Sequence, residues 1–238
     1  AATGERHALS SVVLKSPVAN PNKVIGAPVN YYAHQDEAIE DTGVNFGREI
    51  KTIDHYGLFL KNPVLVGAGE GVDLHFTDRR NDHEVEVSLI IGKTAKNVSY
   101  ENALDYVAAY SIGLDITVRG TEERCLRKAI DSYSVLGPWL VTPDELGDPQ
   151  DVDLWLDVNG QRRQTGNTRT MIFGVKTIVS YLSRFMALQP GDVIPTGTPP
   201  GVGMGHKPPM YLKAGDVMTL GARGLGEQRQ VVVASPAA

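Results

Sequence analysis

Polar and apolar positions alternate along residues 83–92, "HEVEVSLIIG", and this period of two predicts a β-strand. One face of the strand carries only aliphatic side chains: Val85, Val87, Leu89 and Ile91. The other face begins with two carboxylates, Glu84 and Glu86. Two carboxylates that share one face of a strand either face solvent or bind a common cation.

Two longer segments have the spacing of helices. Apolar residues at helical intervals predict a helix over 99–110, with Ser99 as its N-cap, and a second helix over 171–186. After Pro28 we expect one or two further helical turns that end at Gly43.

The remaining segments predict short strands. The turn pair Asn159-Gly160, between two alternating segments, predicts a β-hairpin. Because the strands are spaced like hairpins and not like βαβ units, the predicted fold class is α+β, mostly β. We expect residues 1–22 to form an irregular lead-in and residues 23–238 to form a single domain. The Gly- and Pro-rich segment 195–209 is expected to be a long, shaped loop of the kind that often carries function.

Composition excludes several classes of protein. The chain has 238 residues, 42% of them hydrophobic, and a net charge of -5, so it lacks the basic surface of proteins that bind nucleic acid or anionic membranes. No apolar run is long enough to span a bilayer, and residues 1–23 do not have the pattern of a signal peptide. The single cysteine, Cys125, cannot form an internal disulfide, which favours a reducing, cytoplasmic location.

A third acid, Asp115, lies inside an apolar strand and needs a partner if it is buried. If it joins Glu84 and Glu86, the three carboxylates offer only oxygen ligands, which favour Mg²⁺, Mn²⁺ or Ca²⁺ over zinc. The alternative is a salt bridge from Asp115 to an arginine such as Arg119.

Three further features suggest chemistry. His34 and Glu37 are neighbours if their segment is helical, and a carboxylate that orients an imidazole makes a competent base; the alternative is a surface helix. Lys128 precedes an apolar, turn-rich run, although most lysines are solvated. Thr196 and Thr198 could offer hydroxyl groups to an anion, but the loop that carries them lacks the Gly-Lys-Ser/Thr end of a P-loop.

Taken together, these segments resemble the fumarylacetoacetate hydrolase family from about Lys23 to Val233. The matching segments occur in the family's order: "NYYAH..E", "LFLKNP", "HEVEVSLIIGK", "ALDYVAAYSIGLDITVR", "RKAIDSYSVLGPWLVT", "VNGQRRQTGNTRTMIF", "LQPGDVIPTGTPPGVG" and "LKAGDVM". The resemblance implies a mixed β-sandwich roll, a homodimer, and an enzyme of the short bacterial type.

The resemblance also implies a set of site residues. Mg²⁺ or Mn²⁺ would be bound by Glu84, Glu86 and Asp115. His34 and Glu37, on a lid helix, would activate a water molecule, and Lys128 would stabilise developing negative charge. The residues expected to contact a small-molecule carboxylate substrate are Lys61, Thr198 and Arg119.

Many members of the family have an Arg-Asp-x-Gln run and a longer loop where this chain has the short segment 119–127, which begins Arg-Gly-Thr-Glu. The family resemblance therefore predicts the metal ligands of this chain better than it predicts the identity of its substrate. The expected activity is hydrolytic cleavage of a C–C bond in a 2-oxo acid or a diketo or 2-hydroxy-dienoate dicarboxylate, in the catabolism of aromatic compounds. The alternatives are a decarboxylase, a 2-hydroxyhepta-2,4-diene-1,7-dioate-type isomerase, and a non-catalytic relative that binds a small ligand.

Overall fold

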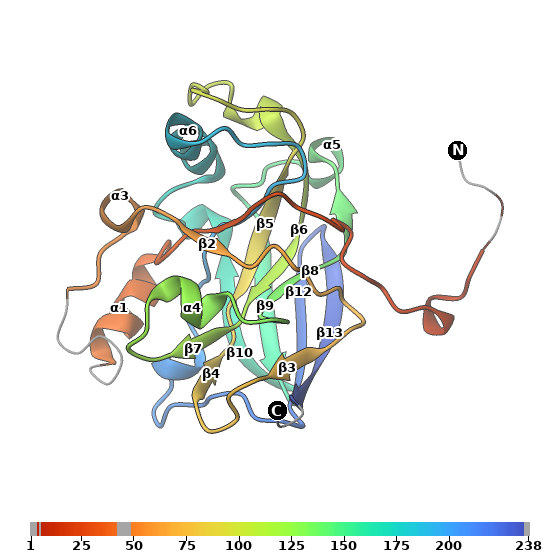
Figure 1. Cartoon of the computed structure of the whole chain (residues 1–238), viewed down its shortest axis with the longest axis vertical. Helices are drawn as coiled ribbons and strands as arrows, with labels where there is room; N and C mark the ends of the chain where they lie inside the picture. Colours follow the sequence, from red (N-terminus) through yellow and green to blue (C-terminus); the bar gives the residue numbers. More distant parts are fainter. Residues whose placement is uncertain (1–3, 5, 42–48, 236–238) are drawn as a thin grey trace.

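The computed structural model describes every residue except 1–3, 5, 42–48 and 236–238. Its central layer is a six-stranded sheet (Figure 1). In spatial order the strands are β2 (Phe59–Lys61), β1 (Val24–Gly26), β11 (Val193–Pro195), β5 (Val85–Ile91), β6 (Val107–Asp115) and β8 (Ser134–Val141). Strands β5 and β6, the two that carry the predicted acids, are antiparallel neighbours near the middle of this sheet.

A five-stranded sheet packs against the first. Its strands, in spatial order, are β10 (Gln161–Asn167), β9 (Asp153–Val158), β12 (Val217–Ala222), β13 (Gly226–Ala234) and β3 (Val72–Leu74). A separate antiparallel pair consists of β4 (Arg80–Asp82) and β7 (Thr117–Arg119), the short strands that flank β5 and β6 in the sequence.

The helices are short and lie around the sheets (Figure 1). They are α1 (Tyr32–Glu40), α3 (Ile53–Tyr56), α4 (Arg124–Lys128), α5 (Pro143–Leu146) and α6 (Val175–Phe185). The described residues also contain four 3₁₀ turns: η1 (Leu9–Ser11), η2 (Ala103–Tyr106), η3 (Thr168–Thr170) and η4 (Gly203–Gly205). The predicted fold class, α+β and mostly β, is confirmed.

Strand β5 is buried on both faces. Its aliphatic face, with Val85 and Leu89, belongs to the main hydrophobic cluster, which includes Leu156 of β9 and Leu220 of β12. Its other face is covered as well, because Glu84, Glu86 and Ser88 are all buried. The predicted faces of this strand are therefore correct, whereas the alternative of a solvent-facing acidic face is wrong.

The helix predicted over 99–110 is wrong. Only residues Ala103–Tyr106 form a turn of 3₁₀ helix, and the chain then enters β6 at Val107. Val107 pairs with Ile91 of β5, and from Tyr110 onward β6 pairs with β5 on one side and with β8 on the other. Sheet pairing with two neighbours thus outweighs a helical periodicity that is only local.

The other local predictions hold with adjusted ends. The second predicted helix is α6, which begins at Val175 and not at residue 171. The hairpin β9–β10 turns at Asn159 and Gly160, both with positive φ, as a two-residue turn of this type requires. The helical turns after Pro28 form α1; their expected end at Gly43 lies outside the described residues.

Residues 6–22 contain only η1 as regular structure, so the lead-in is irregular where it is described. No helix among the described residues is both long enough and apolar enough to cross a membrane. The division at residue 23 and the cytoplasmic location stay predictions.

Candidate active site

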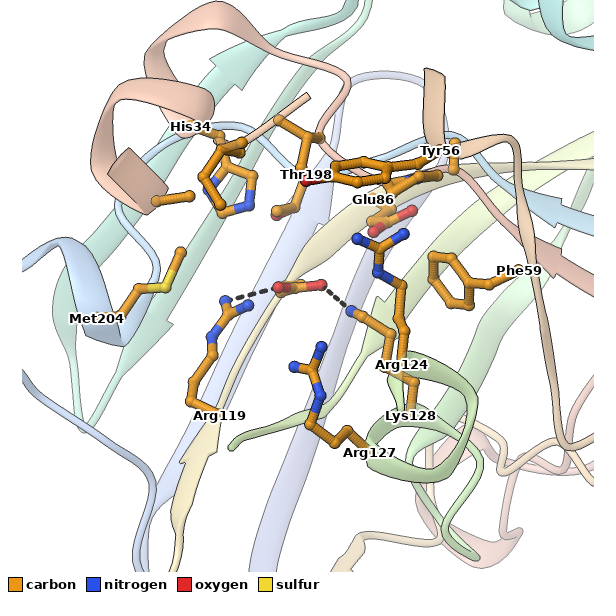
Figure 2. A pocket seen from close by; sticks show the side chains of 16 residues that line it. His34, Tyr56, Phe59, Glu86, Arg119, Arg124, Arg127, Lys128, Thr198 and Met204 are labelled. Carbon is orange, nitrogen blue, oxygen red and sulfur yellow. Dashed lines mark hydrogen bonds and ion pairs between the residues drawn. The ribbon is translucent and has the colours of Figure 1, made fainter. Parts of the chain in front are cut away.

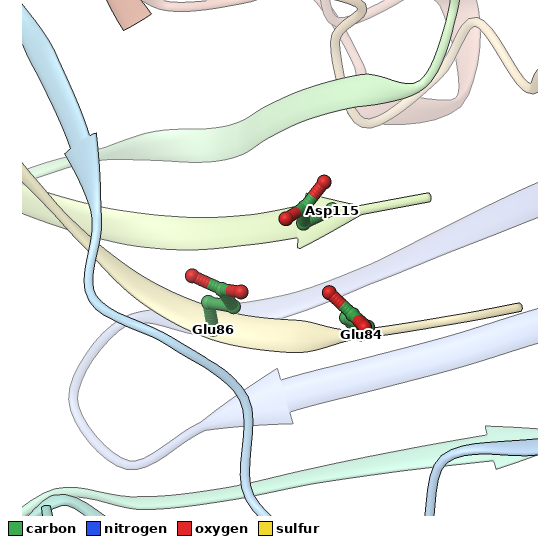
Figure 3. A group of neighbouring side chains, drawn as sticks. All are labelled: Glu84, Glu86 and Asp115. Atoms are coloured by element: carbon green, nitrogen blue, oxygen red, sulfur yellow. The ribbon is translucent and has the colours of Figure 1, made fainter. Parts of the chain in front are cut away.

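Three carboxylates meet where β5 and β6 run side by side (Figure 3). Glu86 lies within β5, Glu84 immediately precedes it, and Asp115 ends β6. The Asp115 backbone N–H donates to the Glu84 carbonyl at 2.9 Å, which fixes these two residues opposite each other. All three side chains are buried, and one oxygen from each lies within 4.8 Å of the others. The predicted grouping of Glu84, Glu86 and Asp115 is therefore present in the fold.

Two lysine ammonium groups lie against this acidic group. Lys128 Nζ donates to Glu84 Oε2 at 2.6 Å and to Asp115 Oδ2 at 2.7 Å. Lys61 donates to the other oxygen of Asp115 and to the Tyr133 carbonyl. Both lysines are buried, so the alternative of a solvated Lys128 is wrong.

Arg119 does not pair with Asp115, so the alternative of a salt bridge between these two residues is wrong. Its guanidinium donates to Asp82 Oδ2 at 2.8 Å and to Glu84 Oε1 at 2.6 Å. The reason is the pairing of β7 with β4, which brings Arg119 beside the strand that carries Asp82. Asp82 also accepts the backbone N–H groups of Gly203 and Met204, at 2.5 and 3.2 Å, and so ties the loop 195–209 to this region.

The three acids experience different electrostatic environments. Burial alone would raise the pKa of Glu84, but Lys128 and Arg119 beside it lower that pKa well below its usual range. Burial raises the pKa of Glu86 well above its usual value, and the charges of Asp115 and Glu84 add to the effect. The hydrogen bond that Glu86 Oε2 accepts from the Gly197 N–H at 2.7 Å offsets only part of this. Glu86 is thus the member of the group that most lacks a cation.

The donor set fits a hard divalent cation. Three buried carboxylates supply oxygen ligands only, as Mg²⁺ and Mn²⁺ prefer. The ammonium of Lys128 bridges Glu84 and Asp115, which demonstrates that a single cation can bind both. Glu86 would then complete the coordination and lose the penalty of an uncompensated buried charge.

His34 and Glu37 face each other on α1. His34 Nδ1 lies 3.2 Å from Glu37 Oε2, and the other oxygen of Glu37 accepts the Gly201 N–H at 2.6 Å. His34 is buried and lines the same pocket as Glu84 and Glu86 (Figure 2). The reading of His34 as an incidental residue on a surface helix is therefore wrong.

The threonines of the loop 195–209 are bound to the protein itself. Thr198 Oγ1 donates to the Val85 carbonyl at 2.9 Å and accepts from Gln164 Nε2 at 2.7 Å. Thr196 Oγ1 donates to the Val87 carbonyl at 2.7 Å. Thr198 lines the pocket, but its hydroxyl hydrogen is already used, so its first role is to dock the loop on β5.

The pocket itself has a volume of about 100 Å³ and lies between α1, α4 and the acidic group (Figure 2). Its lining includes side chains that the sequence analysis did not single out: Tyr56, Phe59, Arg124, Arg127 and Met204. Lys61 is not part of this lining and lies against Asp115. The arginines had one signal in the sequence. In "RCLRK" they are three residues apart, and Arg124 is four residues before Lys128, which places them near Lys128 on one helix.

A family profile and a relative of known name both match most of this chain. The profile of the family described as fumarylacetoacetate (FAA) hydrolase C-terminal matches residues 23–233. A maleylpyruvate hydrolase from Aquipseudomonas alcaligenes is 55% identical over 198 residues, covering 82% of this chain and 69% of that protein.

Solved structures align over nearly the whole chain. The maleylpyruvate hydrolase from Sphingobium sp. SYK-6, in complex with manganese(II) ion and pyruvate, is 37% identical with a TM-score of 0.80, covering 95% of this chain and 76% of that chain. The 2-hydroxyhepta-2,4-diene-1,7-dioate isomerase from Mycobacterium marinum is 29% identical with a TM-score of 0.79, covering 99% of this chain and 83% of that chain.

Proposed function

The chain belongs to the fumarylacetoacetate hydrolase family, and from that premise we propose that it hydrolyses the C–C bond between the two halves of an acylpyruvate. The resemblance read from the sequence is confirmed, as are the fold and the assignment as an enzyme. The observation that carries the proposal is that His34, which contacts Glu37, lines a pocket that Glu84, Glu86 and Lys128 also line.

Glu84, Glu86 and Asp115 would hold the divalent cation, whose chemistry is that of a Lewis acid toward the 2-oxo acid. Manganese(II) is present in the related Sphingobium structure, which agrees with this donor set. Lys128 currently binds two of these carboxylates, so its ammonium is already at the place where the pyruvate half would lie.

His34 is the proposed general base. Because Nδ1 donates to Glu37, the remaining nitrogen, Nε2, is the acceptor that faces the pocket. It takes a proton from a water molecule, whose oxygen forms a new bond to the acyl carbonyl carbon. Glu37 is itself held by the Gly201 N–H, so α1 and the loop 195–209 fix the orientation of the imidazole together.

The bond between the acyl carbon and the pyruvate methylene then breaks, and its electron pair passes to the pyruvate half as an enolate. The positive charge of Lys128 stabilises this developing negative charge. The proton on His34 is delivered to the methylene carbon, which yields pyruvate and a carboxylic acid. One water is consumed and no further reactant is needed.

A second candidate is isomerisation, favoured by the similarity to the Mycobacterium marinum isomerase. In that case a base removes a proton from the 2-hydroxy-dienoate, and the resulting dienolate takes up a proton at another carbon, with no C–C bond broken. The test is to incubate the Mn²⁺-loaded protein with an acylpyruvate, a 2-hydroxy-dienedioate and oxaloacetate and to identify the products. Hydrolysis predicts pyruvate in equal amount with a carboxylic acid. An isomer or CO₂ as the product, or no turnover that depends on metal, would overturn the proposal.

We further propose that the enzyme is a homodimer, as the family resemblance implies. Trp139 and Leu140 are exposed on β8, the strand at one edge of the six-stranded sheet, and offer apolar surface for a partner. Light scattering after size-exclusion chromatography tests this assembly; the mass of a single chain would contradict it.

A further inference from the structure

The short turn η4 touches two carboxylates that belong to different parts of the site. At its start, Asp82 accepts the backbone N–H groups of Gly203 and Met204, at 2.5 and 3.2 Å. At its end, Gly205 lies directly against Glu37 of α1. A Cβ atom on Gly205 would be 2.5 Å from Glu37 Cδ and closer still to Oε1. The turn therefore joins Asp82 to Glu37 through its own backbone.

The contact with Asp82 connects η4 to the proposed metal ligands. Asp82 is fully buried, and its Oδ2 accepts from Arg119 Nε at 2.8 Å. The same guanidinium donates from Nη2 to Glu84 Oε1 at 2.6 Å. Each of these side chains is buried, so solvent does not compete for the hydrogen bonds that join Glu84 to the turn.

The contact with Glu37 connects η4 to the imidazole of His34. Glu37 Oε1 accepts the Gly201 N–H at 2.6 Å, and Oε2 lies 3.2 Å from His34 Nδ1. The backbone at Gly205 does not itself require glycine, because its φ is not in the left-handed region. The need for glycine comes from Glu37, whose carboxylate fills the space that a side chain at position 205 would occupy.

Helix α1 also rests on the segment that contains η4. Asn30, just before the helix, donates to the Thr196 carbonyl at 2.7 Å. Further along the helix, Ala38 packs with Val202 and Met204 in a small cluster that is separate from the main hydrophobic core. The position of α1 therefore depends on the loop 195–209 at both of these points.

We propose that η4 sets the position of His34 relative to the metal ligands, and that Gly205 is the positioning residue on which this depends. This inference rests on the proposed function, in which His34 is the general base. His34 of α1 and Met204 of η4 line the same pocket (Figure 2). Gly205 touches no reacting atom, and it acts by leaving room for the carboxylate that orients the imidazole.

Gly205→Ala tests the proposal directly. The added methyl group displaces Glu37 Oε1 from the Gly201 N–H, so kcat for an acylpyruvate is expected to fall about tenfold to 100-fold. KM and the Kd for Mn²⁺, measured by calorimetry, are expected to stay at their wild-type values, because the contacts of the three acids are unchanged.

Lys207→Ala is the matched control. Lys207 and Glu40 form an exposed ion pair between the same loop and the same helix. Its removal is expected to leave kcat at the wild-type value, because an exposed pair contributes little and neither residue contacts the His34–Glu37 pair.

A double-mutant cycle shows whether Gly205 acts through Glu37. In a Glu37→Ala background the methyl group of Gly205→Ala has no carboxylate to displace, so it is expected to change kcat by less than about twofold. If Gly205→Ala costs as much activity in this background as in wild type, it disturbs the enzyme by another route and the inference is overturned.

A readout that needs no turnover is the NMR resonance of the His34 Nδ1 proton in the metal-free protein, identified by its loss in His34→Gln. It is expected to shift or disappear in Gly205→Ala and to persist in Lys207→Ala. An unchanged resonance in Gly205→Ala would overturn the inference. If wild type cleaves no acylpyruvate, the proposed function fails, and this resonance alone decides whether Gly205 positions the imidazole.

Discussion

The ammonium of Lys128 lies between Glu84 and Asp115, 2.6 Å from Oε2 of the first and 2.7 Å from Oδ2 of the second. Both carboxylates belong to the predicted metal site. Lys128 is thus positioned to do two things: to balance the charge of these acids and to meet the negative charge that develops on the substrate. The first role puts it in competition with the metal.

Replacing Lys128 with methionine tests this competition. Lys128→Met removes a positive charge from the two shared ligands, so Mn²⁺ is expected to bind about tenfold more tightly. Turnover is expected to fall at least about 100-fold, because the charge that stabilises the enolate is lost. Mn²⁺ titration and steady-state kinetics measure the two effects. Lys213→Met, at an exposed position, is the control, and weaker Mn²⁺ binding in Lys128→Met would contradict the account.

Glu86→Gln tests whether Glu86 is needed to bind the metal and not to stabilise the fold. Burial raises the pKa of Glu86, so removal of its charge is expected to leave the metal-free protein as stable as wild type or more stable. Saturating Mn²⁺ at 100 times its Kd should stabilise wild type by about 2.7 kcal/mol, and this gain should vanish in the variant. Thermal unfolding with and without Mn²⁺ measures both, with the exposed Glu227→Gln as control. A variant that still gains stability from Mn²⁺ would remove Glu86 from the ligand set.

Glu37→Gln tests how His34 is positioned. The amide oxygen of glutamine can still accept the Gly201 N–H, but the partner of His34 Nδ1 is no longer charged. We expect kcat to fall about tenfold to 100-fold with little change in KM, and His34→Gln to cost about 1000-fold. If Glu37→Gln changes KM alone, the pair binds substrate and does not activate water.

Asp82→Asn tests how much Asp82, which holds residues around the site in place, contributes to the stability of the protein. Asp82 is fully buried, pairs with Arg119 and holds the backbone of Gly203 and Met204. Loss of its charge leaves Arg119 with one buried partner, so the free energy of unfolding is expected to fall by about 3 to 5 kcal/mol. Chemical denaturation measures this loss. A change in the free energy of unfolding below about 1 kcal/mol would show that the ion pair between Asp82 and Arg119 contributes little to stability.

The strands of the fold could be predicted where the pattern is local. Alternation along β5 and the Asn159-Gly160 turn depend only on neighbouring residues, and both predictions hold. The helix predicted over 99–110 failed because the sequence does not reveal that Val107 meets β5. Periodicity describes one segment at a time, whereas the sheet partners of a strand come from distant parts of the chain.

The same limit applies to the site. The acids and the His34–Glu37 pair could be found because their chemistry is visible in their spacing and in the family resemblance. Asp82 was missed because its importance comes from the pairing of β4 with β7. Arg124 and Arg127 were missed because lysine and arginine are usually solvated, and only the packing of α4 against β2 and β7 brings them into a pocket.

The central claim is that water attacks the acyl carbonyl of an acylpyruvate. The most direct measurement is turnover by the Mn²⁺-loaded enzyme in H₂¹⁸O, with mass spectrometry of the carboxylic acid released from the acyl half and an enzyme-free sample to correct for exchange. The account predicts one ¹⁸O atom in that carboxylate for each C–C bond cleaved. A carboxylic acid without the label, or turnover that yields no carboxylic acid from the acyl half, would contradict it.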